Sequence, residues 1–167
     1  GRGIGPTYED KIARRGMRVS DFVQSKIRQE KLRKMIAEKT PLYKYVNMTP
    51  PSYEEIEAWA APLAKAIEPF VADTVGIIHS AVEAQKHILF EGAQGTFLDI
   101  DHGTYPFVTS SNTLAGAACV GTGVGPTHIK RVVGIAKAYL TRVGSGPFPT
   151  ELFGDEAEYL RKLGGEF

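Results

Sequence analysis

The sequence has one cysteine, no long apolar run and almost no net charge, and each shortage excludes a class of protein. Cys119 stands alone, so it cannot form an intramolecular disulfide or a cysteine-based zinc site. The longest apolar stretches fall far below the ~20 residues that span a bilayer, so no membrane segment is expected. Twenty basic and nineteen acidic side chains leave a net charge of +1, which offers no electrostatic basis for binding nucleic acid or an anionic membrane. A cytoplasmic protein is therefore expected.

Motifs for binding metals and phosphates are also missing. The four histidines lack the short paired spacing that a helical or hairpin metal site requires. There is no Gly-Lys dipeptide, which excludes a Walker A loop. The glycines of GTGVGP at 121–126 do not stand between a strand and a helix of a βαβ unit, so they indicate a turn rather than a dinucleotide site. A phosphate ligand would need other donors.

Composition and length fit one compact domain. The 167 residues are close to the size of a single domain, and 43% hydrophobic with 23% charged residues is typical of globular proteins. In the first half, apolar residues recur at helical spacing in three segments, residues 20–40, 52–67 and 70–82. Ser20 or Asp21 can cap the first segment, and Ser52 with Glu55 forms a capping box at the second. A mainly helical subdomain over residues 1–86 is therefore predicted.

After this helical half the composition shifts toward glycine, threonine and β-branched residues. The run at 87–90 predicts a buried strand, and the alternation over 97–101 predicts a second one. Residues 132–143 fit either a helix or a strand, and their valines with flanking Gly-Pro turns favour a strand. Residues 155–163 predict a short final helix that ends before two glycines. The pattern predicts an α/β fold, with residues 87–167 as a partial sheet domain.

Polar groups beside the predicted strands are candidate binding residues. Gln94 lies in EGAQG after the first strand, where its amide could contact a carbonyl-bearing base, stabilise charge developing on an oxygen, or cap a turn. Asp99, Asp101 and His102 carry groups that a divalent cation could use. The favoured interpretation is a turn whose carboxylates bond to backbone N–H groups.

A basic cluster stands near the N-terminus, in a segment that begins as a helix. It contains Lys11, Arg14, Arg15 and Arg18. Arginine forks match phosphate oxygens, so the cluster could bind an anion, although a solvated basic face is the commoner fate of such a run. From the residues alone, the chain is an α/β domain whose candidate ligand is an anion or a nucleotide.

Three long strings resemble the adenylosuccinate synthetase family. They are GIGPTYEDKIARRGMR at 3–18, ILFEGAQGTFLDIDHGTYPFVTSSNT at 88–113 and KAYLTRVGSGPFPTEL at 137–152. The first fits the family signature G-I-x-P-x-Y-x-x-K-x-x-R, and the three stand in the family's order over essentially the whole chain. The resemblance implies an α/β fold in which this chain supplies a helical subdomain and part of a mostly parallel central sheet, incomplete by itself.

The resemblance also implies a ligase of AMP biosynthesis that joins IMP and L-aspartate. GTP is hydrolysed with Mg²⁺, and the reaction passes through 6-phosphoryl-IMP. Position by position, it implies that Gln94 is catalytic at the IMP 6-oxygen and that Thr109 binds the IMP phosphate. Arg14 would reach the IMP of the neighbouring subunit in a homodimer, and Lys11, the signature lysine, would have a supporting catalytic role.

Other parts of the family pattern have no counterpart in this sequence. These are the glycine-rich GTP and IMP loop with its catalytic aspartate, the catalytic histidine, the metal ligands, and the aspartate- and guanine-binding regions. We therefore expect the chain alone to be inactive, at most a weak IMP binder, and either marginally stable or self-associating. The alternative is a non-catalytic IMP-binding or dimerisation module.

Overall fold

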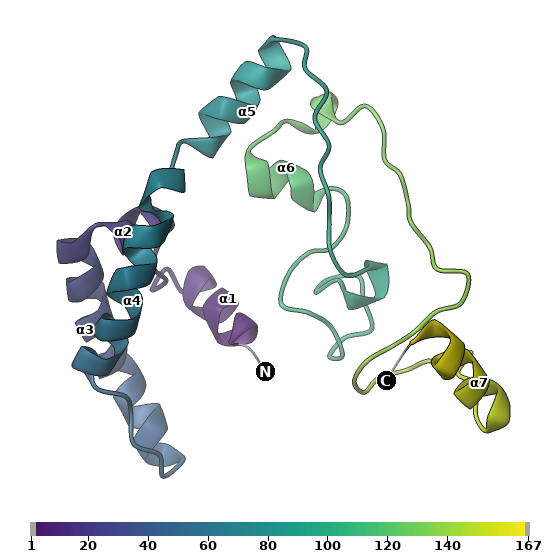
Figure 1. Cartoon of the computed structure of the whole chain (residues 1–167), viewed down its shortest axis with the longest axis horizontal. Coiled ribbons are helices and arrows are strands. Elements are labelled where there is room, and N and C mark those ends of the chain that lie inside the picture. The colour runs from purple at the N-terminus through teal and green to yellow at the C-terminus, as the bar shows by residue number, and fades with distance from the viewer. Residues whose placement is uncertain (1–2, 166–167) are drawn as a thin grey trace. The chain divides into compact units, whose positions relative to one another are not determined.

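The computed structural model describes residues 3–165, which belong to two compact units. The first unit runs to Phe90 and includes Ala118–Val124, whereas the second comprises Glu91–Ala117 and the residues from Gly125 onward. The described residues form helices joined by irregular backbone (Figure 1). The α-helices are α1 (Ile4–Ile12), α2 (Val19–Val23), α3 (Ser25–Tyr45), α4 (Tyr53–Ile67), α5 (Thr74–Glu83), α6 (Ala117–Thr122) and α7 (Asp155–Gly164). The 3₁₀ turns are Glu68–Phe70, Thr96–Leu98 and Pro126–His128.

Helices α2, α3 and α4 pack against one another in the first unit (Figure 1). The start of α4 is the predicted capping box: Ser52 Oγ accepts from Glu55 N at 3.2 Å, and Glu55 Oε2 accepts from Ser52 N at 2.8 Å. Leu32 of α3 and Ala60 and Ala64 of α4 are buried. The two alanines leave room for the neighbouring backbone to approach, so this small bundle packs through small residues on α4.

A buried arginine links the three helices. Nε of Arg28 in α3 donates to Glu57 Oε2 of α4 at 3.1 Å, and Nη2 donates to Glu57 Oε1 at 2.8 Å. Nη1 donates to the Phe22 carbonyl of α2 at 2.9 Å. The hydrogen bond from Arg28 lowers the pKa of Glu57 against the opposing effect of burial. The pair therefore stays charged, and it holds α3 to α4 through two parallel bonds.

The segment around Gly123 lies against α5 within the same unit. Asp73 caps α5, because its Oδ1 accepts from Gly76 N at 3.1 Å. His79 Nε2 of α5 lies 3.1 Å from the Gly123 carbonyl oxygen. Gly123 has φ +78°, and a Cβ there would come within 3.2 Å of Val75 Cγ1. Glycine therefore permits both the backbone conformation and the close approach at this point.

The second unit is mostly irregular. Its first part is a loop over residues 94–114, and its last helix is α7. The final helix predicted at 155–163 is confirmed as α7, which ends with Gly165 in the left-handed conformation at φ 65°.

The predicted α/β fold is wrong, because none of the described residues 3–165 lies in a strand. The segments 87–90 and 132–143 have no regular secondary structure, and 97–101 begins inside the 3₁₀ turn Thr96–Leu98. Leu89 is 89% exposed and Ile135 is 97% exposed. β-branched composition expresses only a local preference, whereas a strand also needs a hydrogen-bonded neighbour, and these segments have none within the described part of the chain.

Two helix boundaries also differ from the prediction. The single helix expected over 20–40 is two helices, because Gln24 has an extended backbone (φ −83°, ψ 106°) between α2 and α3. The helix expected from residue 70 begins at Thr74, because the Glu68–Phe70 turn and the Asp73 cap come first. None of the helices seen in residues 3–165 has the length and apolar character needed to span a membrane.

Candidate functional site

Gln94 and Thr109 come together in the second unit. Gln94 Nε2 donates to Thr109 Oγ1 at 3.4 Å, which is the long end of the hydrogen-bond range. Gln94 is exposed and Thr109 is half-buried, so both side chains are accessible. Gln94 has φ 65°, a left-handed conformation that is uncommon for residues other than glycine. Strain of this kind gathers at ligand sites, where the surrounding structure holds the residue in place.

Asp99 anchors the loop that carries Gln94 and Thr109. Its side chain is fully buried, at 0% exposure. One oxygen, Oδ1, accepts from Asp101 N at 3.0 Å and from His102 N at 3.1 Å. The other, Oδ2, accepts from Thr113 N at 2.6 Å and from Leu114 N at 3.4 Å. One carboxylate thus joins the start of the loop to its end.

These bonds decide the ionisation of Asp99 and its role. Burial alone would raise the pKa of Asp99, but the backbone N–H donors outweigh burial and lower the pKa to about 2. Asp101 Oδ2 accepts from Asn112 Nδ2 at 2.6 Å. The predicted turn, with its carboxylate bonded to backbone N–H groups, is therefore confirmed in preference to a cation site at Asp99, Asp101 and His102. No group of three or more His, Cys, Asp or Glu side chains within residues 3–165 could hold a metal ion.

Further bonds tie Gln94 and Thr109 to this turn. Thr113 Oγ1 donates to the Gly95 carbonyl at 2.8 Å, next to Gln94. Thr109 N donates to the Leu98 carbonyl at 2.9 Å, next to Asp99. The distance between the Gln94 amide and the Thr109 hydroxyl is thus set by a network centred on Asp99.

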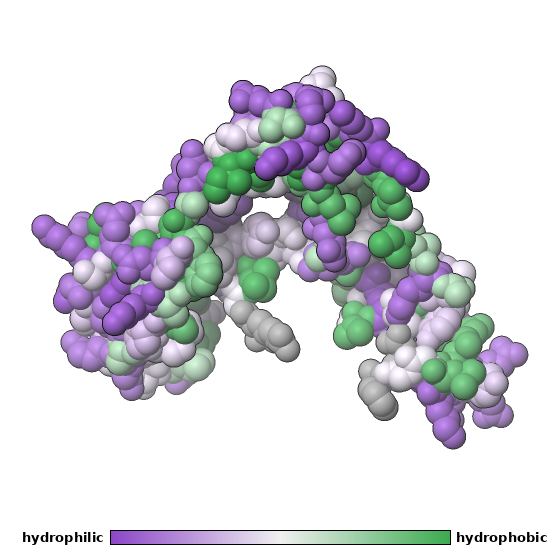
Figure 2. All heavy atoms as spheres, turned by 45° about the horizontal axis from the view of Figure 1, so that its top comes forward, coloured by the Kyte–Doolittle hydropathy of each residue, from purple (hydrophilic) through white to green (hydrophobic). Residues whose placement is uncertain are grey.

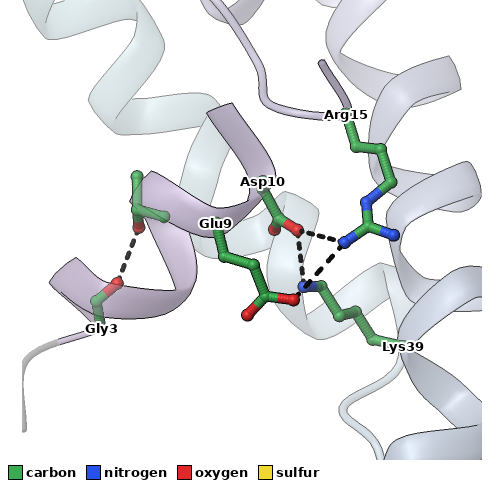
Figure 3. A network of polar contacts seen from close by, with 6 residues as sticks. Gly3, Glu9, Asp10, Arg15 and Lys39 are labelled. Carbon is green, nitrogen blue, oxygen red and sulfur yellow. Dashed lines mark hydrogen bonds and ion pairs between the residues drawn. The ribbon is translucent and has the colours of Figure 1, made fainter. Parts of the chain in front are cut away.

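In the first unit, Arg15 of the basic cluster belongs to a network of ion pairs with Glu9 and Asp10, which Lys39 also joins (Figure 3). Asp10 of α1 is 7% exposed, and its Oδ1 accepts from Lys39 Nζ of α3 at 2.7 Å and from Arg15 Nη2 at 3.3 Å. Arg15 also lies 3.7 Å from Glu9. The hydrogen bond from Lys39 lowers the pKa of Asp10, against burial. Lys39 therefore holds α1 to α3, whereas Arg15 is paired with two carboxylates of α1.

Arg14 is placed differently from its neighbour. Its Nη1 donates to the Ile12 carbonyl at 3.0 Å, and it makes no ion pair with any residue of the described range 3–165. It has φ 58°, so it also sits in the left-handed region. Arg14, Arg15, Lys31 and Lys34 line a cavity of about 110 Å³ together with Glu38. Arg15 is paired with Asp10 and Glu9, and Lys31 with Asp21, so the positive charge offered to an anionic group there comes from Arg14 and Lys34.

Lys11 and Arg18 are the remaining members of the cluster. Lys11 Nζ lies 5.6 Å from the centre of the Tyr8 ring, at a distance that permits a cation–π contact. Arg18 precedes α2, and its backbone N donates to Asp21 Oδ2 at 2.9 Å. The helix cap predicted at Ser20 or Asp21 is wrong, because the N-cap is Arg18 and Asp21 lies at the third position of α2.

The sequence singled out Asp99 and favoured a turn around it, but it did not single out Arg142 of the second unit. Arg142 bonds to the loop from 35 and 38 residues away in sequence. No local spacing marks such a contact, so nothing short of the folded chain could have found it.

Comparison with known proteins gives one family. A family model described as adenylosuccinate synthetase matches residues 1–167. The chain is 55% identical to the adenylosuccinate synthetase of Geobacter metallireducens and 54% identical to that of Sorangium cellulosum, over 100% and 99% of its length. It covers 39% of each of these curated relatives. The solved structure of fully ligated adenylosuccinate synthetase from Plasmodium falciparum matches with a TM-score of 0.92 and 37% identity, over 99% of this chain and 38% of that one.

Proposed function

We propose, from the premise that this chain belongs to the adenylosuccinate synthetase family, that its 94–114 loop supplies part of an IMP site. This premise is supported by the family model, which matches the whole chain. The complete protein would be the purine-biosynthesis ligase that joins IMP to L-aspartate with hydrolysis of GTP. The chain spans 39% of its curated relatives, and the share of that activity that we propose for it is binding and orienting IMP.

The chemistry requires a donor at the purine 6-oxygen. That oxygen is a poor leaving group, so phosphorylation by GTP would convert it into one before the aspartate amine attacks C6 and expels phosphate. Negative charge develops on the 6-oxygen during this activation, and a fixed N–H donor stabilises it. Gln94 carries such a donor, and its amide bonds to Thr109 Oγ1 at 3.4 Å.

The meeting of Gln94 and Thr109 is the observation that carries the proposal. Two polar side chains 15 residues apart lie within 3.4 Å, on a loop anchored by a buried carboxylate. Their mutual bond is long, so either group can exchange it for a bond to a ligand at little cost. In the proposed complex, the Gln94 amide faces the base and the Thr109 hydroxyl donates to the 5′-phosphate.

Arg14 is proposed as a phosphate ligand for a second copy of the chain in a homodimer. Its guanidinium can bind two phosphate oxygens at once, and it is exposed at the cavity that it lines with Lys34. Lys11 would add positive potential in the same segment. Arg15 is unsuited to this role, because it is already paired with Asp10 and Glu9.

The family implies GTP and Mg²⁺, but the described residues do not fit a magnesium site. Asp99 is occupied by backbone donors, and no carboxylate cluster of sufficient size is present in residues 3–165. No step through a metal is therefore assigned to this chain. Phosphoryl transfer would depend on residues that the chain does not supply.

A titration of the 167-residue chain with IMP tests the proposal. We expect IMP to bind, and inosine, which lacks the phosphate, to bind more weakly. The Thr109→Val variant should weaken IMP binding about tenfold with little change for inosine, because it removes one charge-assisted hydrogen bond. Gln94→Leu should weaken both ligands, because both carry the 6-oxygen. Isothermal calorimetry measures each affinity.

Two matched variants serve as controls. Thr150→Val changes an exposed threonine of the same unit and should leave both affinities unchanged. Arg15→Ala serves beside Arg14→Ala, since only the latter should reduce IMP binding, and only at concentrations where the chain dimerises. Absence of IMP binding at millimolar ligand, or equal binding of IMP and inosine, would refute the proposed site.

A further inference from the structure

Arg142 contacts the loop of the proposed site from a distant part of the second unit. Its Nη2 donates to the Phe107 carbonyl at 3.0 Å and to Thr104 Oγ1 at 3.2 Å. Nη2 also lies 3.1 Å from the Ser145 carbonyl, to which Nε donates at 3.3 Å. Arg142 is half-buried, and its bond to Thr104 Oγ1 is partly shielded from water, whereas its bonds to the Phe107 and Ser145 carbonyls are exposed. One guanidinium thus joins residues 104–107 to the turn that follows Arg142 itself.

The bonds of Arg142 lead directly to the Thr109 backbone. Phe107, whose carbonyl accepts from Arg142, stands two residues before Thr109. Thr104 and Phe107 form a turn, because Phe107 N donates to the Thr104 carbonyl at 2.8 Å. Thr104 N in turn donates to the Phe97 carbonyl at 3.0 Å, which joins this turn to the earlier part of the loop. Asp99 fixes one side of the loop and Arg142 the other. The Thr109 hydroxyl therefore lies between two anchored points.

Gly146 lies close to the contact between Arg142 and Phe107 and leaves no space there for a side chain. Its φ is +123°, and a Cβ added there would overlap Arg142 Nη2 and lie 2.7 Å from Phe107 Cβ. The glycine is required both by the backbone conformation and by the space that the guanidinium occupies. Alanine at this position would displace the guanidinium without changing the arginine.

We propose that Arg142 is a positioning residue for phosphate recognition: its guanidinium holds residues 104–107 so that the Thr109 hydroxyl stays beside the Gln94 amide. The inference rests on the proposed IMP site for its functional consequence. Arg142 itself touches no ligand in this scheme. Its planar fork suits the role, since a lysine ammonium cannot reach the Phe107, Thr104 and Ser145 oxygens with the same geometry.

Nuclear magnetic resonance of the intact 167-residue chain tests the positioning directly. In Arg142→Met and in Gly146→Ala, the side-chain amide signals of Gln94 and the backbone amide signal of Thr109 should shift, while those of α7 stay in place. Arg142→Lys should give a partial shift. Arg131→Lys is the control, since it alters an exposed arginine of the same unit and should leave the loop signals unchanged.

Affinities supply the functional measure. Arg142→Met should weaken IMP about tenfold while inosine changes little, so the ratio of the two affinities falls. Unchanged Gln94 and Thr109 signals in Arg142→Met would overturn the inference, as would loss of all second-unit signals, which would show a general stabilising role. If the unaltered chain binds no IMP, the proposed function fails, while the resonance shifts still decide the positioning role of Arg142.

Discussion

The Asp99 carboxyl holds together a loop that has almost no regular structure. A buried carboxylate is costly unless hydrogen bonds replace its water, and here backbone donors from both ends of the loop do so. Four of these donors are main-chain groups, and the Asn112 side-chain amide adds a longer bond to Asp99 Oδ1 at 3.4 Å, so the anchoring depends mainly on the backbone path and on the charge of one residue. The loop is therefore sensitive to protonation at a single position.

The loop is expected to lose its order in acid. The pKa of Asp99 is lowered from 3.8 to about 2, so its ionised form stabilises the fold above pH ~4 and this contribution is lost as the pH falls toward 2. Asp99→Asn should abolish this dependence and loosen the loop at every pH, because an amide nitrogen cannot accept from Thr113 N. Amide hydrogen exchange at Thr113 and His102 between pH 2 and pH 5 measures the effect.

A neighbouring carboxylate provides the control for this prediction. Asp101 is exposed and accepts from the Asn112 side chain, so Asp101→Asn should leave the exchange of the backbone amides bonded to Asp99 nearly unchanged. Equal effects of the two substitutions would contradict the assignment of Asp99 as the anchor.

At the scale of elements, the Arg28–Glu57 ion pair joins α3 to α4 in the first unit. Arg28→Ala should destabilise α2, α3 and α4 by about 3 kcal/mol, because it leaves Glu57 without its partner in a partly buried position. Arg28→Lys should recover little, since lysine cannot form the two parallel bonds to Glu57. Thermal unfolding followed by circular dichroism gives the loss. Lys26→Ala, at an exposed position of α3, should have little effect; a comparable loss there would show that helix propensity rather than the ion pair was measured.

Helices of this chain could be predicted because their signals are local. The Ser52 and Glu55 capping box lies within four residues of the helix that it starts, and Gly165 directly follows the helix that it ends. The break at Gln24 could not be predicted, since no glycine or proline marks it in the sequence. Strand prediction failed at 87–90 and 132–143 because pairing is a property of two segments.

The same difference between local signals and contacts of distant segments applies to the candidate site. Gln94 was identified from its place in a glycine-rich string, and the family resemblance singled out Thr109, but their meeting depends on Asp99 and its bonds to Thr113. Arg142 had no local signal, because its partners lie 35 or more residues away. Sequence thus indicated which groups could bind a ligand, whereas the residues that hold them in place required the folded chain.

At the scale of the whole molecule, the chain exposes more surface than its mass requires. Its accessible surface is 13676 Å². A compact chain of 18.2 kDa would expose about 8,100 Å², and two separate compact units of half that mass about 9,800 Å² together. Separation into two compact units therefore does not account for the extra accessible surface, which belongs to the units themselves. Figure 2 shows hydrophobic side chains on the outer surface among the polar ones. Phe70, Leu89 and Ile135 are 84%, 89% and 97% exposed.

Such a surface predicts that the isolated chain associates with itself. Exposed apolar side chains gain free energy on burial, at roughly 25 cal/mol per Å², and a second copy is the partner present at highest concentration. Sedimentation velocity over a range of concentrations should show a growing share of dimers or larger species. Leu89→Asp and Ile135→Asp should reduce that share, whereas Gln85→Asp, which adds the same charge at a polar exposed position, should do so less. A chain that stays monomeric at high concentration and unfolds cooperatively at high temperature would mean that the exposed side chains are packed in solution, and the units would then be stable without a partner.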